Sequence, residues 1–318
     1  MKHFFLASKS GLSECTLSDA NEIAVIGQTP CEALNYFCRS RDQKYLFATA
    51  RERVYAFDIS ARPVKVTSDV SCEGKVACHL TLSPDEKWLY VANYISGDVA
   101  VFAVNDGKLT FVQLVKSPGA CGPNLARQEA PHAHCTMIMP DGRHLAVADL
   151  GCDAVWVYPL TGAGLGELAA KLISPPGSGP RHLAWASATQ GFLFTELSNE
   201  LYRLNINGKE LAIDTAVSTT ARGFVKHSQG SAIKISPDQK TVAVANRGED
   251  TIAFFDVETM HEAWRIPAGG IWPRDFEFVD RDRILVCNQN SDTLTVINLR
   301  NMSTQTLSVE EPLSTLCV

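Results

Sequence analysis

The feature that most constrains the fold of this chain is a short motif that returns along its whole length. A polar Ser-Pro-Asp turn followed by an apolar run begins at Ser83 and returns at Ser236. Copies with a modified turn start at Met139, Arg41, Ser187 and Asp280. At the proline position the six copies fall at residues 41, 84, 140, 187, 237 and 280, and successive copies are 43 to 56 residues apart. A period of about 40 to 50 residues built from short strands is typical of the blades of a β-propeller.

Each repeat predicts four short strands separated by turns, and the six repeats fill about residues 33 to 310. The two ends of the chain predict a seventh unit. Residues 2–8 match a second strand with no first strand before it, and residues 313–318 match a first strand with no second strand after it. Pairing the tail with the head would remove two open sheet edges. We therefore expect an all-β, seven-bladed β-propeller, a single domain over residues 1–318, whose last blade is closed by the N- and C-terminal strands.

Composition narrows the possible partners and the compartment. The net charge of −6 is spread along the chain, without a basic stripe, so we expect no nucleic-acid partner. No stretch is long and apolar enough to cross a bilayer, and the apolar start is too short for a secretion signal. The ten cysteines are scattered and form no CxxC pair. These features predict reduced cysteines, a cytoplasmic protein, no membrane partner and a monomer or weak homo-oligomer.

The repeat gives every residue a phase, and two phases carry polar residues. The start of the innermost strand, six residues before the turn position, holds Asn35, Cys78, His134, Arg181, Ser231 and Arg274. The end of the second strand, nine residues after it, holds Ala50, Asn93, Asp149, Glu196 and Asn246, and Asn288 joins them if one turn residue is missing. In an antiparallel pair the start of one strand lies beside the end of the next. Both sets are therefore expected at one mouth of the channel. The insertion at 113–131 is expected to form a loop on one face of the ring, which in repeat folds is often the binding face.

These residue types suit a small anionic or polyhydroxylated ligand. Arginine offers planar donors for a carboxylate or phosphate, and a carboxylate near histidine and arginine can act as a general base. The asparagines and Asp149 also have a structural interpretation, because they are common turn formers at strand ends. Glu196 is harder to explain in that way, and Arg181 and Arg274 at a buried phase are costly unless they are paired or used.

Five segments together resemble one family. They are Arg127–His134, Asp149–Asp153, Gly179-Pro180-Arg181-His182, Asn246-Arg247-Gly248 and Trp272-Pro273-Arg274. In order and phase they resemble the seven-bladed propeller lactonases, which include the cycloisomerase-type 6-phosphogluconolactonases and the carboxymuconate lactonising enzyme. The resemblance covers nearly the whole chain. The segment Ala186-Ser187-Ala188 departs from it, since the family has a proline-containing turn there.

The resemblance implies an active site of one histidine, two arginines and one glutamate. On this sequence these are His134, Arg181, Glu196 and Arg247. We assign the substrate-binding positions to Arg274, Asn93, Asp149, Asn246, Asn288 and His132. The expected reaction is hydrolysis of a sugar lactone, 6-phosphogluconolactone or a related aldonolactone, with no cofactor and no metal. Glu196 or His134 would be the general base, and no Ser or Cys nucleophile with a paired base is visible.

Three other interpretations stay open at this point. Cycloisomerisation of a muconate-type acid would use the same groups in the reverse direction. A ring of oxygen ligands at Asn93, Asp149, Glu196, Asn246 and Asn288 could hold Ca²⁺ or Mg²⁺, although the nearby arginines oppose a cation. A non-catalytic binding scaffold is the fourth interpretation, because propellers often serve that use.

Overall fold

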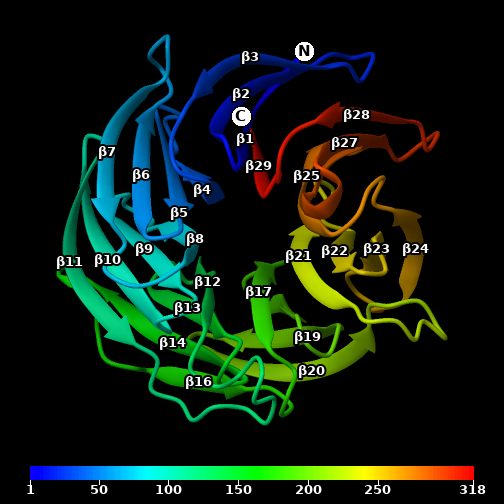
Figure 1. Cartoon of the computed structure of the whole chain (residues 1–318). Coiled ribbons are helices and arrows are strands. Elements are labelled where there is room, and N and C mark those ends of the chain that lie inside the picture. Colours follow the sequence, from blue (N-terminus) through cyan, green and yellow to red (C-terminus); the bar gives the residue numbers. More distant parts are fainter. The chain divides into compact units, whose positions relative to one another are not determined.

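The chain folds almost entirely into antiparallel β-strands. The structure is a computed structural model that describes residues 1–318, and its one helix is the three-residue 3₁₀ turn η1, Gln289–Ser291. Seven sheets are present, six of four strands and one of five. Each follows the predicted order of inner, second, third and outer strand (Figure 1). The prediction of an all-β, seven-bladed β-propeller is confirmed.

The chain divides into two compact units. The central unit comprises Asn35–Ser198 and Tyr202–Thr215, and the terminal unit comprises Met1–Leu34, Asn199–Leu201 and Ala216–Val318.

The central unit carries four sheets. The strands of the first two are β4 (Leu34–Arg39), β5 (Tyr45–Ala50), β6 (Arg53–Asp58), β7 (Lys65–Ser71), β8 (Ala77–Leu82), β9 (Trp88–Asn93), β10 (Asp98–Asn105) and β11 (Lys108–Lys116). Those of the next two are β12 (Ala133–Ile138), β13 (His144–Asp149), β14 (Ala154–Thr161), β15 (Gly164–Leu165), β16 (Ala170–Ile173), β17 (Pro180–Trp185), β18 (Gln190–Thr195), β19 (Glu200–Asn207) and β20 (Glu210–Ser218).

The terminal unit carries the other three sheets. Their strands are β21 (Gln229–Ile235), β22 (Thr241–Arg247), β23 (Thr251–Asp256), β24 (Glu262–Pro267), β25 (Pro273–Asp280), β26 (Arg283–Asn288), β27 (Thr293–Asn298), β28 (Thr304–Ser308), β29 (Ser314–Cys317), β1 (Lys2–Ser8), β2 (Gly11–Leu17) and β3 (Ile23–Thr29).

The two ends of the chain share one sheet, as predicted. The strand order is β29-β1-β2-β3, and β29 pairs antiparallel with β1, with Phe4 opposite Cys317 and Ala7 opposite Ser314. Figure 1 shows the red C-terminal strand beside the blue N-terminal one. The tail therefore supplies the inner strand that the head lacks.

The recurring Ser-Pro-Asp motif is a hydrogen-bonded turn between the inner and second strands. The Ser83 hydroxyl donates to Asp85 Oδ1 at 2.6 Å and accepts the backbone N–H of Trp88 at 3.0 Å. The same arrangement occurs at Ser236, where the hydroxyl donates to Asp238 at 2.7 Å. Short polar side chains that bond the nearby backbone are the usual stabilisers of tight turns. The motif is therefore conserved from blade to blade for a structural reason.

The core lies between neighbouring sheets. One cluster packs Tyr90 and Val101, from one blade of the central unit, against Val147 and Trp156 from the next. Because both faces of the inner and middle strands are covered, these strands are apolar at almost every position instead of alternating. Strands of this kind position the polar residues at their ends firmly.

The predicted insertion is confirmed as a connection but begins later than expected. Residues 113–116 continue strand β11, and the loop runs only from Ser117 to His132. The outer strand is longer because residues 113–116 pair in register with residues 98–101 of β10.

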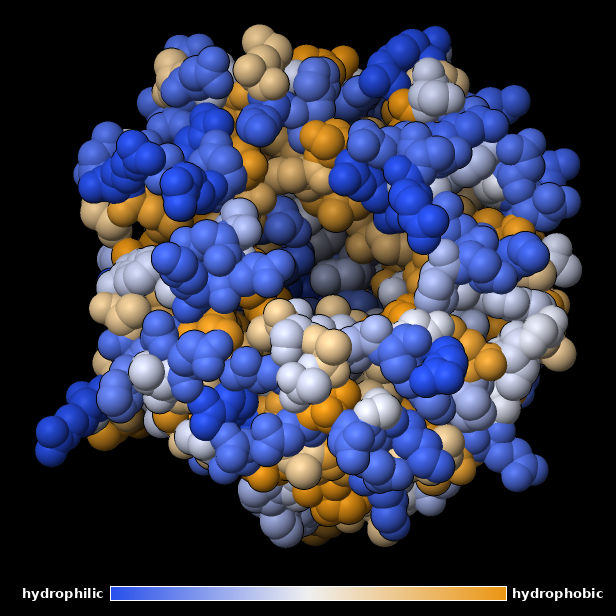
Figure 2. Space-filling view, turned by 180° about the vertical axis from the view of Figure 1, so that it is seen from behind, coloured by the Kyte–Doolittle hydropathy of each residue, from blue (hydrophilic) through white to orange (hydrophobic).

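The face displayed in Figure 2 is largely hydrophilic, with hydrophobic residues scattered among the polar ones. No helix of the chain is long and apolar enough to cross a membrane.

Candidate active site

The expected neighbourhood of strand starts and strand ends is confirmed within each unit. In five sheets the residue at the start of the inner strand faces the end of the second strand. The pairs are Ala77 with Asn93, Ala133 with Asp149, Pro180 with Thr195, Gln229 with Arg247 and Pro273 with Asn288. Asn288 therefore belongs to the second set.

The inner strands share an irregularity that the sequence did not reveal. In β12 the register passes from Ala133 to Cys135 and leaves His134 without an opposite residue. Arg181 in β17 and Arg274 in β25 occupy the same extra position. A β-bulge bends the strand and re-aims one side chain, and bulges are common beside active sites. The phase that carries His134 and Arg181 is thus a bulge position.

Glu196 is the centre of the polar cluster in the central unit. It follows β18 directly, its backbone N–H donates to Gly179 O at 2.8 Å, and its side chain is 4% exposed. Arg181 Nε donates to Glu196 Oε2 at 3.0 Å, and His134 Nε2 lies 3.9 Å from the same oxygen. Three of the four predicted catalytic residues therefore lie together. The turn at Ala186-Ser187-Ala188 shifts the register by one residue, so that Thr195 faces Pro180 where the neighbouring blades have Asp149 and Asn93. Glu196 follows Thr195 and still lies beside Arg181 and His134.

Arg127 is a fourth member of the cluster and was not among the predicted site residues. Its Nη2 donates to Glu196 Oε1 and, at 3.1 Å, to the hydroxyl oxygen of Tyr94. Burial alone would lower the pKa of Arg127, but the Glu196 charge and the hydrogen bonds with Tyr94 and Glu196 raise it above its ordinary value. Arg127 is the only arginine of the insertion, and this is the sequence feature that could have pointed to it as a site residue.

The charges of this cluster do not cancel. A buried carboxylate is costly unless it is paired, and Glu196 has two guanidinium partners. Two arginines and one glutamate leave one positive charge before His134 is counted. An excess positive charge in a partly buried place favours an anion or a developing negative charge.

His132 packs against Tyr94, a residue that contacts the cluster. Its ring stacks on Tyr94 with a centroid distance of 4.5 Å, and its Nδ1 donates to Tyr94 O at 2.8 Å. Its Nε2 lies 3.3 Å from Glu129 Oε1. His132 is almost fully buried, and Tyr94 in turn contacts the His134 ring edge-on at 5.4 Å. These contacts hold the His132 ring against Tyr94, which in turn lies against His134.

A second set of rings lies one residue further along the inner strands. His182 contacts His134 at 5.5 Å and His79 at 5.3 Å between ring centroids, and His79 stacks on Tyr36 at 4.2 Å. Arg181 Nη1 lies 3.2 Å from His182 Nε2. The repeat did not predict these rings, because they lie one residue after the phase that carries His134 and Arg181. His79 and His182 each follow a bulge position, and their rings contact one another beside His134.

The other predicted arginines lie in the terminal unit. Arg247 ends β22, is buried, donates from Nη2 to Gly230 O at 2.8 Å, and lies under the ring of Trp272 at 5.4 Å. Arg274 Nη1 donates to Gln289 Oε1 at 3.4 Å. Both side chains are thus held by neighbours within their own unit.

Four predicted substrate-binding residues are buried within their own blades. Asn93 donates to Cys72 O and Asp98, and Asp149 accepts from the N–H groups of His132, Cys152 and Trp156. Asn246 bonds Thr219, and Asn288 donates to Ala268 O. All four are 0% exposed. These bonds match the structural interpretation of strand-end residues, and the site proposed below does not use them.

No group of three or more His, Cys, Asp or Glu side chains is arranged to hold a metal ion. Both oxygens of Asp149 accept N–H groups, and both oxygens of Glu196 accept guanidinium groups. The oxygen-ligand ring considered above therefore does not fit these side chains.

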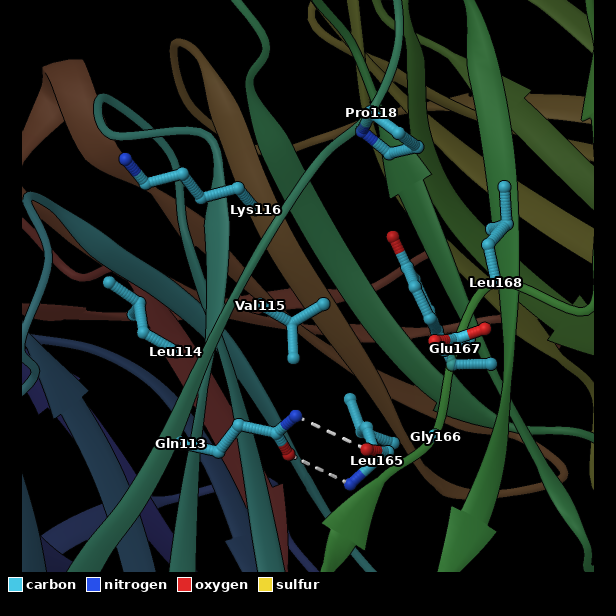
Figure 3. Close-up of a pocket in the computed structure, with 10 residues that line it drawn as sticks. Gln113, Leu114, Val115, Lys116, Pro118, Leu165, Gly166, Glu167 and Leu168 are labelled. Atoms are coloured by element: carbon cyan, nitrogen blue, oxygen red, sulfur yellow. Dashed lines mark hydrogen bonds between the residues drawn. The ribbon is translucent and has the colours of Figure 1, made fainter.

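A groove of about 460 Å³ lies elsewhere in the central unit and is lined by none of the predicted residues. It runs between the end of β11 and the segment 165–168 (Figure 3). Gln113 crosses it, accepting the N–H of Leu165 at 3.0 Å and donating to Leu165 O at 3.2 Å. This pair of bonds joins two neighbouring blades.

A family model described as "Lactonase, 7-bladed beta-propeller" matches residues 6–314 of the chain. The chain belongs to this lactonase family. It is 32% identical over 263 residues to the 6-phosphogluconolactonase of Bacillus subtilis, which covers 80% of this chain and 75% of that protein.

Two solved structures share the whole fold of this lactonase-family chain. The periplasmic gluconolactonase of Pseudomonas aeruginosa is 26% identical with a TM-score of 0.91, and the match covers 100% of this chain and 99% of that one. A protein from Lactobacillus plantarum has the same identity, TM-score and coverage.

Proposed function

We propose that this protein is a metal-independent lactonase that opens a sugar lactone, 6-phosphogluconolactone or a related aldonolactone. The observation that carries the proposal is the buried Glu196 carboxylate, shared by Arg127 and Arg181, with His134 Nε2 at 3.9 Å. The similarity to the 6-phosphogluconolactonase of B. subtilis and to the gluconolactonase of P. aeruginosa supports the same reaction class.

His134 is the general base of this proposal. Both Glu196 oxygens already accept guanidinium hydrogen bonds, so they are poorly placed to take a proton from water. Glu196 instead stabilises the imidazolium that forms when His134 takes that proton. The catalytic hydrogen bond can tighten from the present 3.9 Å when substrate binds.

The reaction then needs three events. The water oxygen bonds to the lactone carbonyl carbon as its proton passes to His134, and the carbonyl oxygen becomes an oxyanion. Arg181 stabilises that oxyanion, a contribution of about 10²- to 10³-fold for one donor in other enzymes. The ring C–O bond breaks, the ring oxygen takes the proton from His134, and the hydroxy acid is released. Arg247 stays a catalytic residue implied by the family resemblance, and no step of this reaction is assigned to it.

The test of this proposal is lactone hydrolysis measured as acid release at constant pH. Wild type should exceed the spontaneous rate, and Glu196→Gln should lower kcat by at least about 10²-fold, because the imidazolium loses its counter-charge. Circular dichroism and thermal unfolding of the variant show whether it is folded.

Dialysis against EDTA completes the test. Full activity after dialysis is expected, and loss of activity that Ca²⁺ or Mg²⁺ restores would refute the metal-independent reaction. A wild-type rate equal to the spontaneous one would refute the lactonase, and activity on carboxymuconate alone would establish the lactonising reaction instead.

We also propose a cytoplasmic location. Cys15, Cys72, Cys152 and Cys287 are buried free thiols. Burial, assisted by the charge of Glu14, raises the pKa of Cys15 to about 12. Unreactive, protonated thiols of this kind behave as small core hydrophobes.

A further inference from the structure

We propose that Arg127 binds the phosphate of the substrate and so makes this lactonase selective for a phosphorylated aldonolactone. This inference rests on the proposed lactonase activity. It adds to the site a residue from the insertion that neither the repeat nor the family resemblance assigns.

The guanidinium of Arg127 has donors to spare. Nη2 alone makes both of its side-chain contacts, with Glu196 and Tyr94. The N–H groups on Nε and Nη1 make no hydrogen bond within the chain. The side chain is 32% exposed, whereas Glu196 beside it is 4% exposed. The guanidinium of Arg127 is therefore held through Nη2, and its other N–H groups can bind a ligand.

The electrostatics favour an anion at this position. Arg127 and Arg181 together exceed the charge of Glu196 by one, and Tyr94 adds no charge. A phosphate offers three acceptor oxygens and at least one negative charge, which match the remaining donors of a guanidinium. A neutral sugar lactone would leave this excess charge without a partner.

The insertion holds Arg127 in place. The next residue, Gln128, is fully buried, and its Nε2 donates to Leu150 O at 2.9 Å and to Asp153 Oδ1 at 2.8 Å. Asp153 also accepts the backbone N–H groups of Gly177 at 2.6 Å and Gly179 at 2.8 Å. One buried carboxylate thus ties the insertion to the residues just before Arg181.

The hydrogen bonds of Gln128 and Asp153 favour ligand binding, because an arginine that is already held in place loses little conformational freedom when it binds a phosphate. Arg127 lies in the insertion and Arg181 in β17, and Asp153 holds both the insertion and the segment just before β17, so the spacing of the two arginines is set before substrate arrives. Preorganised donors of this kind contribute more to affinity than mobile surface lysines or arginines.

The experiment compares Arg127→Gln with wild type on two substrates, 6-phosphogluconolactone and gluconolactone. Any indirect effect through Glu196 falls on both substrates, whereas loss of a phosphate contact falls on one. We expect the preference in kcat/KM for the phosphorylated lactone to fall about 10- to 100-fold, mainly through KM. Arg127→Lys, which keeps the charge, should restore part of the preference. Arg143→Gln, an exposed arginine in the β12–β13 turn, should behave as wild type.

Calorimetric binding of the two products, 6-phosphogluconate and gluconate, provides a readout that does not need turnover. Arg127→Gln should weaken 6-phosphogluconate about tenfold or more and leave gluconate nearly unchanged. Equal losses on both ligands, or no loss, would overturn the phosphate assignment while leaving the lactonase intact. Absence of lactone hydrolysis in wild type would refute the proposed function. The binding measurements would still show whether Arg127 contacts the phosphate.

Discussion

Glu196 shows how much a single residue depends on partners that are distant in sequence. It accepts hydrogen bonds from Arg181, 15 residues earlier, and from Arg127, 69 residues earlier. Asp153 holds Gln128, the neighbour of Arg127, and Gly179, two residues before Arg181. Removing one partner of such a buried ion pair typically costs about 3–5 kcal/mol, because the other charge is left without compensation.

Gly97 has a left-handed backbone conformation and packs closely against the insertion that carries Arg127. It has a φ of 64°, and a Cβ added there would lie 2.3 Å from Pro131 O, in the insertion just before His132. Gly97→Ala should therefore lower the free energy of unfolding by about 2–4 kcal/mol, combining the left-handed conformation with overpacking. It should also reduce kcat/KM, since Pro131 must move.

Gly208→Ala is the matched control for this prediction. Gly208 has a φ of 60° and nothing within 4 Å of the added Cβ, so only the conformational cost of about 1–2 kcal/mol applies. Urea unfolding of both variants measures the difference. Equal losses of stability would show that the contact with Pro131 is unimportant.

At the scale of elements, the recurring turn and the inner-strand bulge have different functions. The turn connects two strands through hydrogen bonds among its own residues, such as those of Ser40 with Asp42 and Tyr45. The bulge at the opposite end of the inner strand presents His134 and Arg181. One end of each blade therefore stabilises the fold, and the other end carries the polar chemistry.

These turns predict a dependence of stability on pH. Hydrogen bonds from the serine hydroxyl, assisted by backbone N–H groups, hold the pKa values of Asp42, Asp85 and Asp238 below the ordinary value of 3.8. Because the folded pKa lies below the unfolded one, this stabilisation is present above about pH 3.8 and is lost as pH falls through the folded values.

The triple variant Asp42→Asn, Asp85→Asn, Asp238→Asn tests the sign. Asparagine keeps an acceptor oxygen but not the charge. The variant should have a lower urea midpoint than wild type at pH 7, and the difference should shrink at pH 2.5. A difference of the same size at both pH values would contradict the linkage to these carboxylates.

At the scale of the whole molecule, the two chain ends complete one sheet. Strand β29 covers the inner edge of β1, and it packs with Phe4 and Leu6 near the core of its unit. Closing a sheet in this way removes an open edge, which would otherwise pair with other chains. The last six residues are therefore part of the fold.

Removing residues 313–318 should expose the β1 edge and part of the apolar core. We expect loss of most soluble protein, and a lower Tm for whatever remains, measured by soluble yield and thermal unfolding. A chain that lacks only Val318, which follows β29, should stay close to wild type. An unchanged Tm in the longer truncation would contradict the role of the tail.

The sequence by itself determined the architecture of this protein, because its repeat is local. A turn such as Ser83-Pro84-Asp85 and the apolar run after it predict strand boundaries within a few residues, and the unmatched ends at residues 2–8 and 313–318 predict how the last sheet is completed. Phase also placed His134, Arg181 and Glu196 at one edge, since strand pairing follows from spacing.

Only the tertiary structure decided which side chains meet. The bulges at His134 and Arg181, the rings of Tyr94 and His182, and the approach of Arg127 to Glu196 depend on contacts between residues far apart in the chain. Spacing along a strand predicts an edge but not the direction of a side chain at an irregular position. An insertion has no register at all, so its one arginine could be located only once the loop was seen fastened to Asp153.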